Sequence, residues 1–367
     1  MSRSKVYFAD FHANPNENLL QKMRRLLKRA GYMDLDLDGK FVALKIHFGE
    51  MGNLAFLRPN YARVVVDVTK EMGGKPFLTD ANTLYVGSRK NALDHLETAY
   101  ANGFNPFVTG CQVIIADGLK GTDEALVPVN GRYVKEAKIG RAVMDADVLV
   151  TLTHFKMHEC AGIGGALKNI GMGCGSRAGK MEMHSNGKPT VDHELCIGCG
   201  ACAKTCAHGA ISFNSKKKAT IDKTKCAGCG RCVGRCPRDA VYAAMDEKYE
   251  ILNKKICEYS LAVVQNRPAF HISFVADVSP FCDCHGENDI PVVQNVGMFA
   301  SFDPVALDLA CAEAVNAQPV VPNSILAKKE STGDHFQTMH PATNWRALVE
   351  YGAEIGLGSL DYELVSI

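Results

Sequence analysis

Hydrophobic residues in the first 160 positions alternate between helical spacing and short continuous runs. The spacing of Leu19, Leu20, Met23, Leu26 and Leu27 predicts an amphipathic helix that ends before Gly31, a residue suited to a C-terminal cap. Continuous apolar runs predict buried strands at 41–47, 76–79, 112–116, 147–153 and 269–276.

Helices are predicted between these strands. One begins at Arg58-Pro59 and ends near Met72, and another covers 91–101. A later helix covers 304–314, with Asp303 at its N-cap. Strands separated by helices indicate an α/β protein with a mainly parallel sheet.

A cysteine-rich window interrupts this pattern, which then resumes. We therefore expect one α/β domain formed by residues 1–190 and 245–367, with an inserted domain at 191–244. The window holds two near-copies of the spacing C-x2-C-x2-C-x3-C. This duplicated spacing is typical of bacterial ferredoxins that hold two [4Fe–4S] clusters, in which the fourth cysteine of each copy binds the other cluster.

The crossed pattern assigns four cysteines to each cluster. The first set is Cys196, Cys199, Cys202 and Cys236, and the second is Cys226, Cys229, Cys232 and Cys206. Pro237 follows the last cysteine as the bacterial pattern expects, whereas Ala207 replaces proline after Cys206. Zinc is the alternative for paired cysteines, but eight cysteines in duplicated spacing argue against it. Two clusters at short range predict one-electron transfer.

Polar residues follow several predicted strands. They are Lys45, His47, Asp80, Asn82, Asp117, His154 and Asp277. Ligands of open α/β sheets bind at the carboxyl ends of the strands, so a cleft is expected there. The alternative is that these are ordinary turn residues.

Two further segments carry candidate chemistry. The stretch 154–175 is rich in glycine and contains His158 and Lys168; the alternative is a loop that enters a helix, with Lys168 in solvent. Cys282 and Cys284 form a C-x-C-H unit beyond a strand end. With Cys174 or His184 nearby they could hold a third metal centre; the alternative is two reduced thiols or a redox-active pair.

The chain resembles a family of ferredoxin-carrying proteins known as a domain of unknown function. The resemblance rests on the cysteine window, the ending SFDPVALDLA at 301–310 and the pair Cys282 and Cys284, and it covers nearly the full length. It implies the fold and the clusters but no assigned activity.

A second resemblance is local. The pattern H-x2-A-G-x-G-G-x2-K is similar to that of nickel-pincer lactate racemases, and it implies a catalytic base at His158, a cofactor-bearing Lys168 and a nickel ligand at His184. Leu57-Arg58-Pro59 is similar to their phosphate-binding stretch. Those racemases lack the ferredoxin insert, and the loop at 87–90 lacks their second catalytic histidine. The resemblance therefore implies a shared ancestral cleft rather than racemase activity.

Composition narrows the class of partner. The chain is 47% hydrophobic and 22% charged, and 41 basic against 40 acidic residues leave a net charge of +1, so neither nucleic acid nor a membrane surface is expected as a partner. The first residues lack the apolar core of a signal peptide, and no run of 18 apolar residues occurs. Eight of the 15 cysteines lie within 41 residues, which favours metal binding in a reducing, oxygen-poor cytoplasm over disulfides.

Three functions remain open. The first is an iron–sulfur oxidoreductase that passes electrons to a ligand or metal in the cleft. The second is an electron carrier or assembly factor that docks a partner enzyme, and the third is a pincer-type metalloenzyme. The partner is accordingly a redox protein or a small-molecule substrate. In the first and third cases, His158, Lys168 and His184 should converge on one cleft, lined also by Arg58 and the cofactor-binding glycines Gly162, Gly164 and Gly165.

Overall fold

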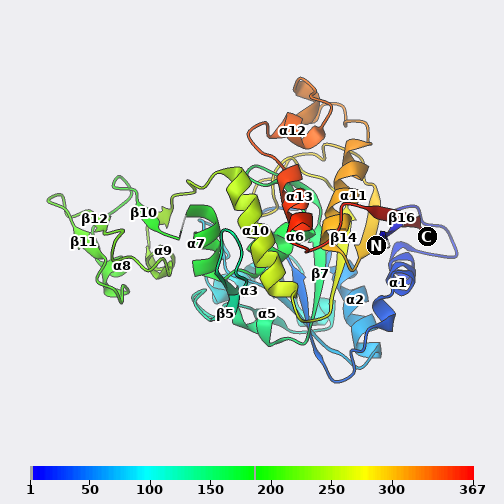
Figure 1. The fold of residues 1–367 in the computed structure, drawn as a ribbon, viewed down its shortest axis with the longest axis horizontal. Helices are drawn as coiled ribbons and strands as arrows, with labels where there is room; N and C mark the ends of the chain where they lie inside the picture. Colours follow the sequence, from blue (N-terminus) through cyan, green and yellow to red (C-terminus); the bar gives the residue numbers. More distant parts are fainter. Residues whose placement is uncertain (1–2, 186) are drawn as a thin grey trace.

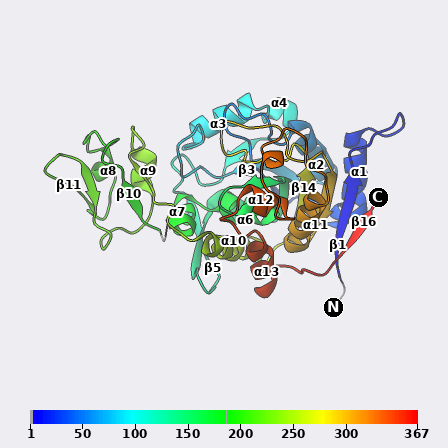
Figure 2. The same ribbon diagram turned by 90° about the horizontal axis from the view of Figure 1, so that it is seen from above.

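The computed structural model describes residues 3–185 and 187–367. Its body is an eight-stranded sheet with helices on both faces (Figures 1 and 2). In spatial order the strands are β16 (Tyr362–Ser366), β1 (Ser4–Asp10), β15 (Gly297–Ser301), β14 (Ala269–Val275), β7 (Val148–His154), β2 (Phe41–Ile46), β3 (Lys75–Asp80) and β4 (Val113–Ile115).

Most neighbouring strands run parallel. β2 is parallel to both β7 and β3, and β7 is also parallel to β14. Only β15, among the described strands of this sheet, is antiparallel to its neighbours β14 and β1. The expected α/β class with a mainly parallel sheet is therefore confirmed. The sequence patterns did not predict β1, β15 or β16, which are short strands of five to seven residues.

Alternate strand residues pack into two hydrophobic cores, one on each face of the sheet. In β2, Ala43 belongs to one core, whereas Val42 and Leu44 belong to the other. This alternation follows from the two-residue period of a strand, and it explains why the run at 41–47 is apolar throughout. The first core contains residues of α6 (Ala166–Cys174), α10 (Tyr249–Val264), α11 (Pro304–Asn316) and α13 (Arg346–Glu354), and the second contains residues of α1 (Leu19–Arg29) and α2 (Pro59–Glu71).

Capping residues start the helices where the sequence predicts. The Asn91 side chain accepts hydrogen bonds from the first turn of α3 (Ala92–Ala101), and Asp303 does the same for α11. Pro59 occupies the first turn of α2, where a missing N–H costs no hydrogen bond. Among the residues described, no helix has the length and apolarity needed to cross a membrane.

Shorter elements complete the body. They are η1 (Tyr32–Asp34), α4 (Pro106–Thr109), α5 (Arg141–Asp145), α12 (His335–Met339), η2 (Leu326–Lys328) and two hairpins, β5 (Glu124–Pro128) with β6 (Glu136–Gly140), and β8 (Lys156–His158) with β9 (Gly162–Gly164).

The cysteine-rich segment projects from the body at the end opposite the two chain termini (Figures 1 and 2). Each copy of the cysteine spacing forms one strand, one short helix and a second strand. The first copy contributes β10 (Pro189–Val191), α8 (Ala201–Lys204) and β11 (Ile211–Phe213), and the second contributes β12 (Ala219–Ile221), α9 (Arg231–Arg235) and β13 (Val241–Ala243). β10 pairs with β13 and β11 with β12, all antiparallel, so the copies are related by an internal symmetry.

The segment is joined to the body through α7 (Arg177–Ser185). Its own core is small, and three of its cysteines lie in one buried cluster with Met181 of α7 and Leu84 of the body. The carbonyl of His184 accepts a hydrogen bond from the N–H of Glu247 at 3.2 Å, which holds the two connections together. The segment therefore packs directly on the body at its base.

Candidate functional site

A cavity of about 230 Å³, lined mainly by buried side chains, lies where β2, β3 and β7 end. Four of the polar residues that follow strands line it, namely Lys45, His47, Asp80 and His154. Lys45 Nζ lies 2.9 Å from Asp80 Oδ1, so two of these side chains form a buried ion pair. The cavity thus occupies the carboxyl edge of the sheet, where ligands of open α/β folds bind.

The other strand-end residues lie elsewhere. Asn82 donates from its backbone and side chain to Asp117 Oδ1 at 2.9 and 2.8 Å, so these two residues close a turn. Asp277 and Arg58 line a separate cavity, and Arg58 therefore does not join the others as expected. The reason is its position before the first turn of α2, on the other face of the sheet.

His158, Lys168 and His184 all line the first cavity, as the convergence hypothesis requires. His158 ends β8, Lys168 lies in the first turn of α6, and His184 lies at the end of α7. Burial and the nearby Lys168 ammonium lower the pKa of His184 to about 3, so this imidazole is neutral at pH 7. Cys174 is instead buried in the hydrophobic core, away from the cavity lining.

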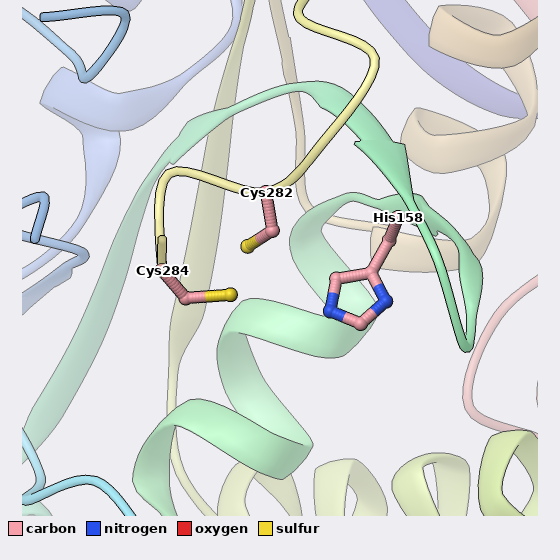
Figure 3. A group of neighbouring side chains, drawn as sticks. All are labelled: His158, Cys282 and Cys284. Carbon is pink, nitrogen blue, oxygen red and sulfur yellow. The ribbon is translucent and has the colours of Figure 1, made fainter. Parts of the chain in front are cut away.

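Two cysteines and one histidine form a candidate metal-binding group beside the cavity. The ligand atoms of His158, Cys282 and Cys284 all lie within 4.8 Å of one another, and all three residues are buried. Figure 3 shows the three side chains pointing toward a common space, with the cysteines on one loop and the histidine on the facing hairpin. A neighbouring group of the same spacing consists of Glu159, Cys284 and His285.

Positive charge surrounds the two thiols. Lys168 Nζ lies 3.8 Å from Cys282 Sγ. Burial by itself would lower the pKa of Lys168, but the sulfurs of Cys282 and Cys284 outweigh it and raise that pKa. Lys168 is therefore an ammonium, and it does not have the depressed pKa of a nucleophilic amine. Burial opposes ionisation of Cys282, yet the hydrogen bond from Cys284 and the charge of Lys168 hold its pKa well below the usual range.

Asp283, between the two cysteines, fixes this arrangement. Its carboxylate is fully buried and lies 2.6 Å from Lys156 Nζ, 3.3 Å from His154 Nδ1 and 3.6 Å from His47 Nδ1. Burial would raise the pKa of Asp283, but the Lys156 ammonium and the hydrogen bond from His154 hold it well below the ordinary value. Sequence reasoning missed Asp283 and Lys156, although both lie inside motifs that it singled out. Each is a charged residue between two candidate ligands: Asp283 lies between Cys282 and Cys284, and Lys156 lies between His154 and His158. That position is the signal by which the sequence could have indicated them.

The candidate cofactor-binding glycines have neighbours within the protein. Gly164 and Gly165 line the cavity, whereas Gly162 does not. A Cβ on Gly165 would lie 2.3 Å from Asp308 Oδ1, because the Asp308 carboxylate accepts two backbone N–H groups at the start of α6. Gly162 has a φ of +82°, and a Cβ there would lie 2.8 Å from Trp345 Cβ. Packing therefore accounts for Gly162 and Gly165 without a ligand.

The eight cysteines of the projecting segment fall into two sets of four. One small cavity is lined by Cys196, Cys199, Cys202 and Cys236, and a second by Cys206, Cys226, Cys229 and Cys232. These are the two sets that the crossed pattern assigns. The Cys196 sulfur accepts a backbone N–H from Ala219, and the Cys206 sulfur accepts one from Ala210, both at 3.4 Å.

The fold and these groups define an α/β protein with a cysteine-rich segment and candidate metal-binding side chains. The chain belongs to the family described as Domain of unknown function (DUF362), which matches residues 42–313. A thylakoid-associated protein from Synechocystis sp. is 26% identical over 167 residues, which cover 43% of this chain and 46% of that protein. The chain thus spans about half the length of the curated relative that it matches.

Two solved structures are similar to this chain. The lactate racemase apoprotein from Thermoanaerobacterium thermosaccharolyticum has a TM-score of 0.35 at 15% identity, over 70% of this chain and 49% of its own. A protein from Thermotoga maritima has a TM-score of 0.39 at 12% identity, over 81% of this chain and 58% of its own.

Proposed function

We propose that this protein is an iron–sulfur oxidoreductase in which a ferredoxin-like domain at 191–244 holds two [4Fe–4S] clusters. The clusters pass electrons to a metal or small-molecule ligand in the cavity at the sheet edge. The observation that carries the proposal is the separation of the eight cysteines into two cavities, each lined by three cysteines of one copy and the fourth of the other.

The spacing of the sulfurs favours clusters over zinc. In a tetrahedral site with Zn–S bonds of about 2.3 Å, neighbouring sulfurs lie roughly 3.8 Å apart. In the described part of the chain, the groups of three or more ligand atoms within 4.8 Å of one another all contain residues of the body, and none contains these eight cysteines. A cubane cluster is larger than a single ion, so it holds its four thiolates further apart.

Contacts at the base of the ferredoxin-like domain supply a route for electrons. Leu84 and Met181 pack in one buried cluster with Cys196, Cys202 and Cys232. Leu84 also lines the cavity, as does His184 immediately before the domain. An electron that leaves the clusters toward the body would therefore reach the cavity through packed side chains rather than through solvent.

The electron acceptor that best fits the cavity is a metal held by His158, Cys282 and Cys284. Thiolate and imidazole ligands suit soft or borderline metals such as zinc, iron, nickel and copper. Three ligands leave a position open for substrate, as in catalytic sites. Lys168 offsets the charge of the Cys282 thiolate, whereas the hydrogen bond with Cys282 and burial raise the pKa of Cys284. One sulfur is therefore already ionised, and binding of a metal would deprotonate the other. No observation favours the nickel-pincer alternative over this one, because Lys168 is a countercharge and Arg58 lies in another cavity.

Metal analysis of anaerobically purified protein tests the proposal. We expect about eight iron and eight acid-labile sulfide per chain from the two clusters. We also expect roughly one further metal per chain, and electron paramagnetic resonance of the reduced protein should show interacting [4Fe–4S]⁺ signals. Protein that holds zinc and no iron, with or without reconstitution by iron and sulfide, would refute the redox function.

A further inference from the structure

A second, larger cavity of about 740 Å³ lies between the ferredoxin-like domain and the body. Loops of the body at 90–91 and 119–122 form one side of the cavity, and α8 and α9 form the other. Six cationic side chains line it, namely Lys90, Lys120, Arg177, Lys204, Arg231 and Arg235. Among the described residues, its lining contains no carboxylate.

One of these cations is buried with an unused donor. Arg177 is 2% exposed, and its Nε has no hydrogen-bond partner among the described residues. Its Nη2 donates to the carbonyl of Lys90. A Cβ on Gly234 of α9 would lie 1.7 Å from Arg177 Nη1, so the guanidinium fills the seam between the domain and the body. Lys90 is paired with Asp239, whereas Lys120, Lys204, Arg231 and Arg235 form no ion pair among the described residues.

The ferredoxin-like domain as a whole also carries a net positive charge. Residues 191–244 contain nine Lys and Arg against four Asp and Glu, an excess of five positive charges in a chain whose net charge is +1. The remainder of the chain therefore carries a net charge of −4. Positive charge on the part that projects from the body attracts an acidic macromolecule at long range.

Cys199 connects this charge to the electron path. It is exposed, and among the described cysteines it alone lines both the small cavity of the first set and the cationic cavity. A partner seated among the cations would thus lie against a ligand of the first cluster.

We infer that the cationic cavity is the docking surface for an acidic electron-carrier protein, which reduces the first cluster beside Cys199. This inference rests on the proposed function. In each encounter one electron leaves the reduced iron–sulfur or flavin cofactor of the carrier and reduces one [4Fe–4S]²⁺ cluster to [4Fe–4S]⁺, with no bond made or broken. A small polyphosphate would fit the charges but supplies no electron, and the test separates it.

The experiment uses the full-length holoprotein and a chemically reduced, strongly acidic ferredoxin as probe. Stopped-flow absorbance gives the second-order rate of cluster reduction for wild type, for Lys204→Glu with Arg235→Glu, and for Lys216→Glu with Lys217→Glu. The last pair is the matched control: it changes charge equally in the same domain, but both residues lie outside the cavity lining, in the β11–β12 turn. Iron content and reduction by dithionite show that each variant holds its clusters.

We expect the cavity variant to lose at least tenfold in rate at low ionic strength, and the control less than twofold. The wild-type rate should also fall steeply as salt is added. Equal losses in the two variants, with clusters intact, would overturn the docking site and leave the proposed function standing. Inorganic triphosphate that binds the wild type but not the cavity variant, while carrier rates stay equal, would reassign the cavity to a small polyanion. Absence of clusters would instead refute the proposed function itself.

Discussion

The two cysteine-containing regions bring their side chains together in different ways. In the projecting segment, eight cysteines lie within 41 residues, and short turns place them around two small cavities. In the body, His158 and the pair Cys282 and Cys284 are more than 100 residues apart in sequence. They meet because β7 and β14 are adjacent parallel strands whose ends lie side by side. The first group depends on local spacing, whereas the second depends on the fold.

The regions also differ in what stabilises them. The body has two extensive hydrophobic cores, whereas the segment has one small cluster in which three cysteines are themselves members. A domain of roughly 50 residues buries too little apolar surface for ample stability, so metal binding should supply much of it. In the body, apolar burial in the two cores offsets the desolvation cost of the buried charges near the cavity.

The largest effect should come from breaking the crossed pattern in the segment. Cys206→Ser removes the fourth ligand of the second set, and we expect loss of the cluster held by Cys226, Cys229 and Cys232. The cluster bound by the sequence neighbours of Cys206 should remain. Iron should fall from about eight to about four per chain, as measured by metal analysis with electron paramagnetic resonance of the reduced protein.

Cys111→Ser is the matched control, because Cys111 is a buried cysteine of the body outside both groups. It should leave the iron content unchanged. If Cys206→Ser removed only the first cluster, the crossed assignment would be wrong.

The next effect concerns the group formed by the fold. Cys284→Ser should abolish stoichiometric binding of the metal beside the cavity, because serine is a poor ligand for a soft metal. The two clusters should keep their iron and their spectra. Inductively coupled plasma mass spectrometry of the anaerobic protein checks both statements.

Cys257→Ser provides the comparison, since Cys257 is buried in α10 and donates to the Leu348 carbonyl. It should retain the metal. Equal metal content in Cys284→Ser and wild type would show that the thiols serve another purpose.

The two regions show which parts of the fold and of the candidate site could be predicted from the sequence. The spacing of apolar residues and the residues at the helix starts predicted β2, α2 and α11, because these signals lie within or next to each element. The cysteine spacing predicted two sets of four for the same reason. Arg58 was misplaced, because nothing in its neighbourhood tells on which face of the sheet α2 packs. Asp283 was missed, because its partners Lys156 and His47 come from separate segments that only the folded sheet brings together.

Asp283→Asn should be the most destabilising of the charge substitutions in the body. It keeps the shape of the side chain but leaves the buried Lys156 ammonium without its anion, and breaking such a pair costs about 3–5 kcal/mol. The single tryptophan, Trp345, is buried in the body, so its fluorescence reports the free energy of unfolding in urea.

The control is Asp36→Asn, which breaks the pair between Lys40 and Asp36, where the Asp36 side chain is 79% exposed. Solvent screens an exposed pair, so this substitution should change the free energy of unfolding far less than Asp283→Asn does. Similar losses for the two variants would mean that the Lys156–Asp283 pair is not desolvated in the native protein.

The smallest effect we expect is a dependence on pH from Lys180, a buried cavity residue whose ammonium donates to the Gly175 carbonyl. Burial lowers the pKa of Lys180 to about 8, despite the attraction of Asp117 and Asp80, from an ordinary value of 10.5. Between about pH 8 and 10.5 the unfolded chain therefore binds more protons than the folded one, and the free energy of unfolding rises with pH. Relative to Lys180→Met, the wild type should gain about 1 kcal/mol per pH unit above pH 8 and show no such slope below pH 7.

Trp345 fluorescence in urea at pH 7, 8, 9 and 10 measures this difference in the free energy of unfolding. The control is Lys204→Met, an exposed change in the segment, which should give no slope. Parallel curves for wild type and Lys180→Met would place the Lys180 ammonium in contact with water, and the cavity would then be wetter than its buried ion pairs imply.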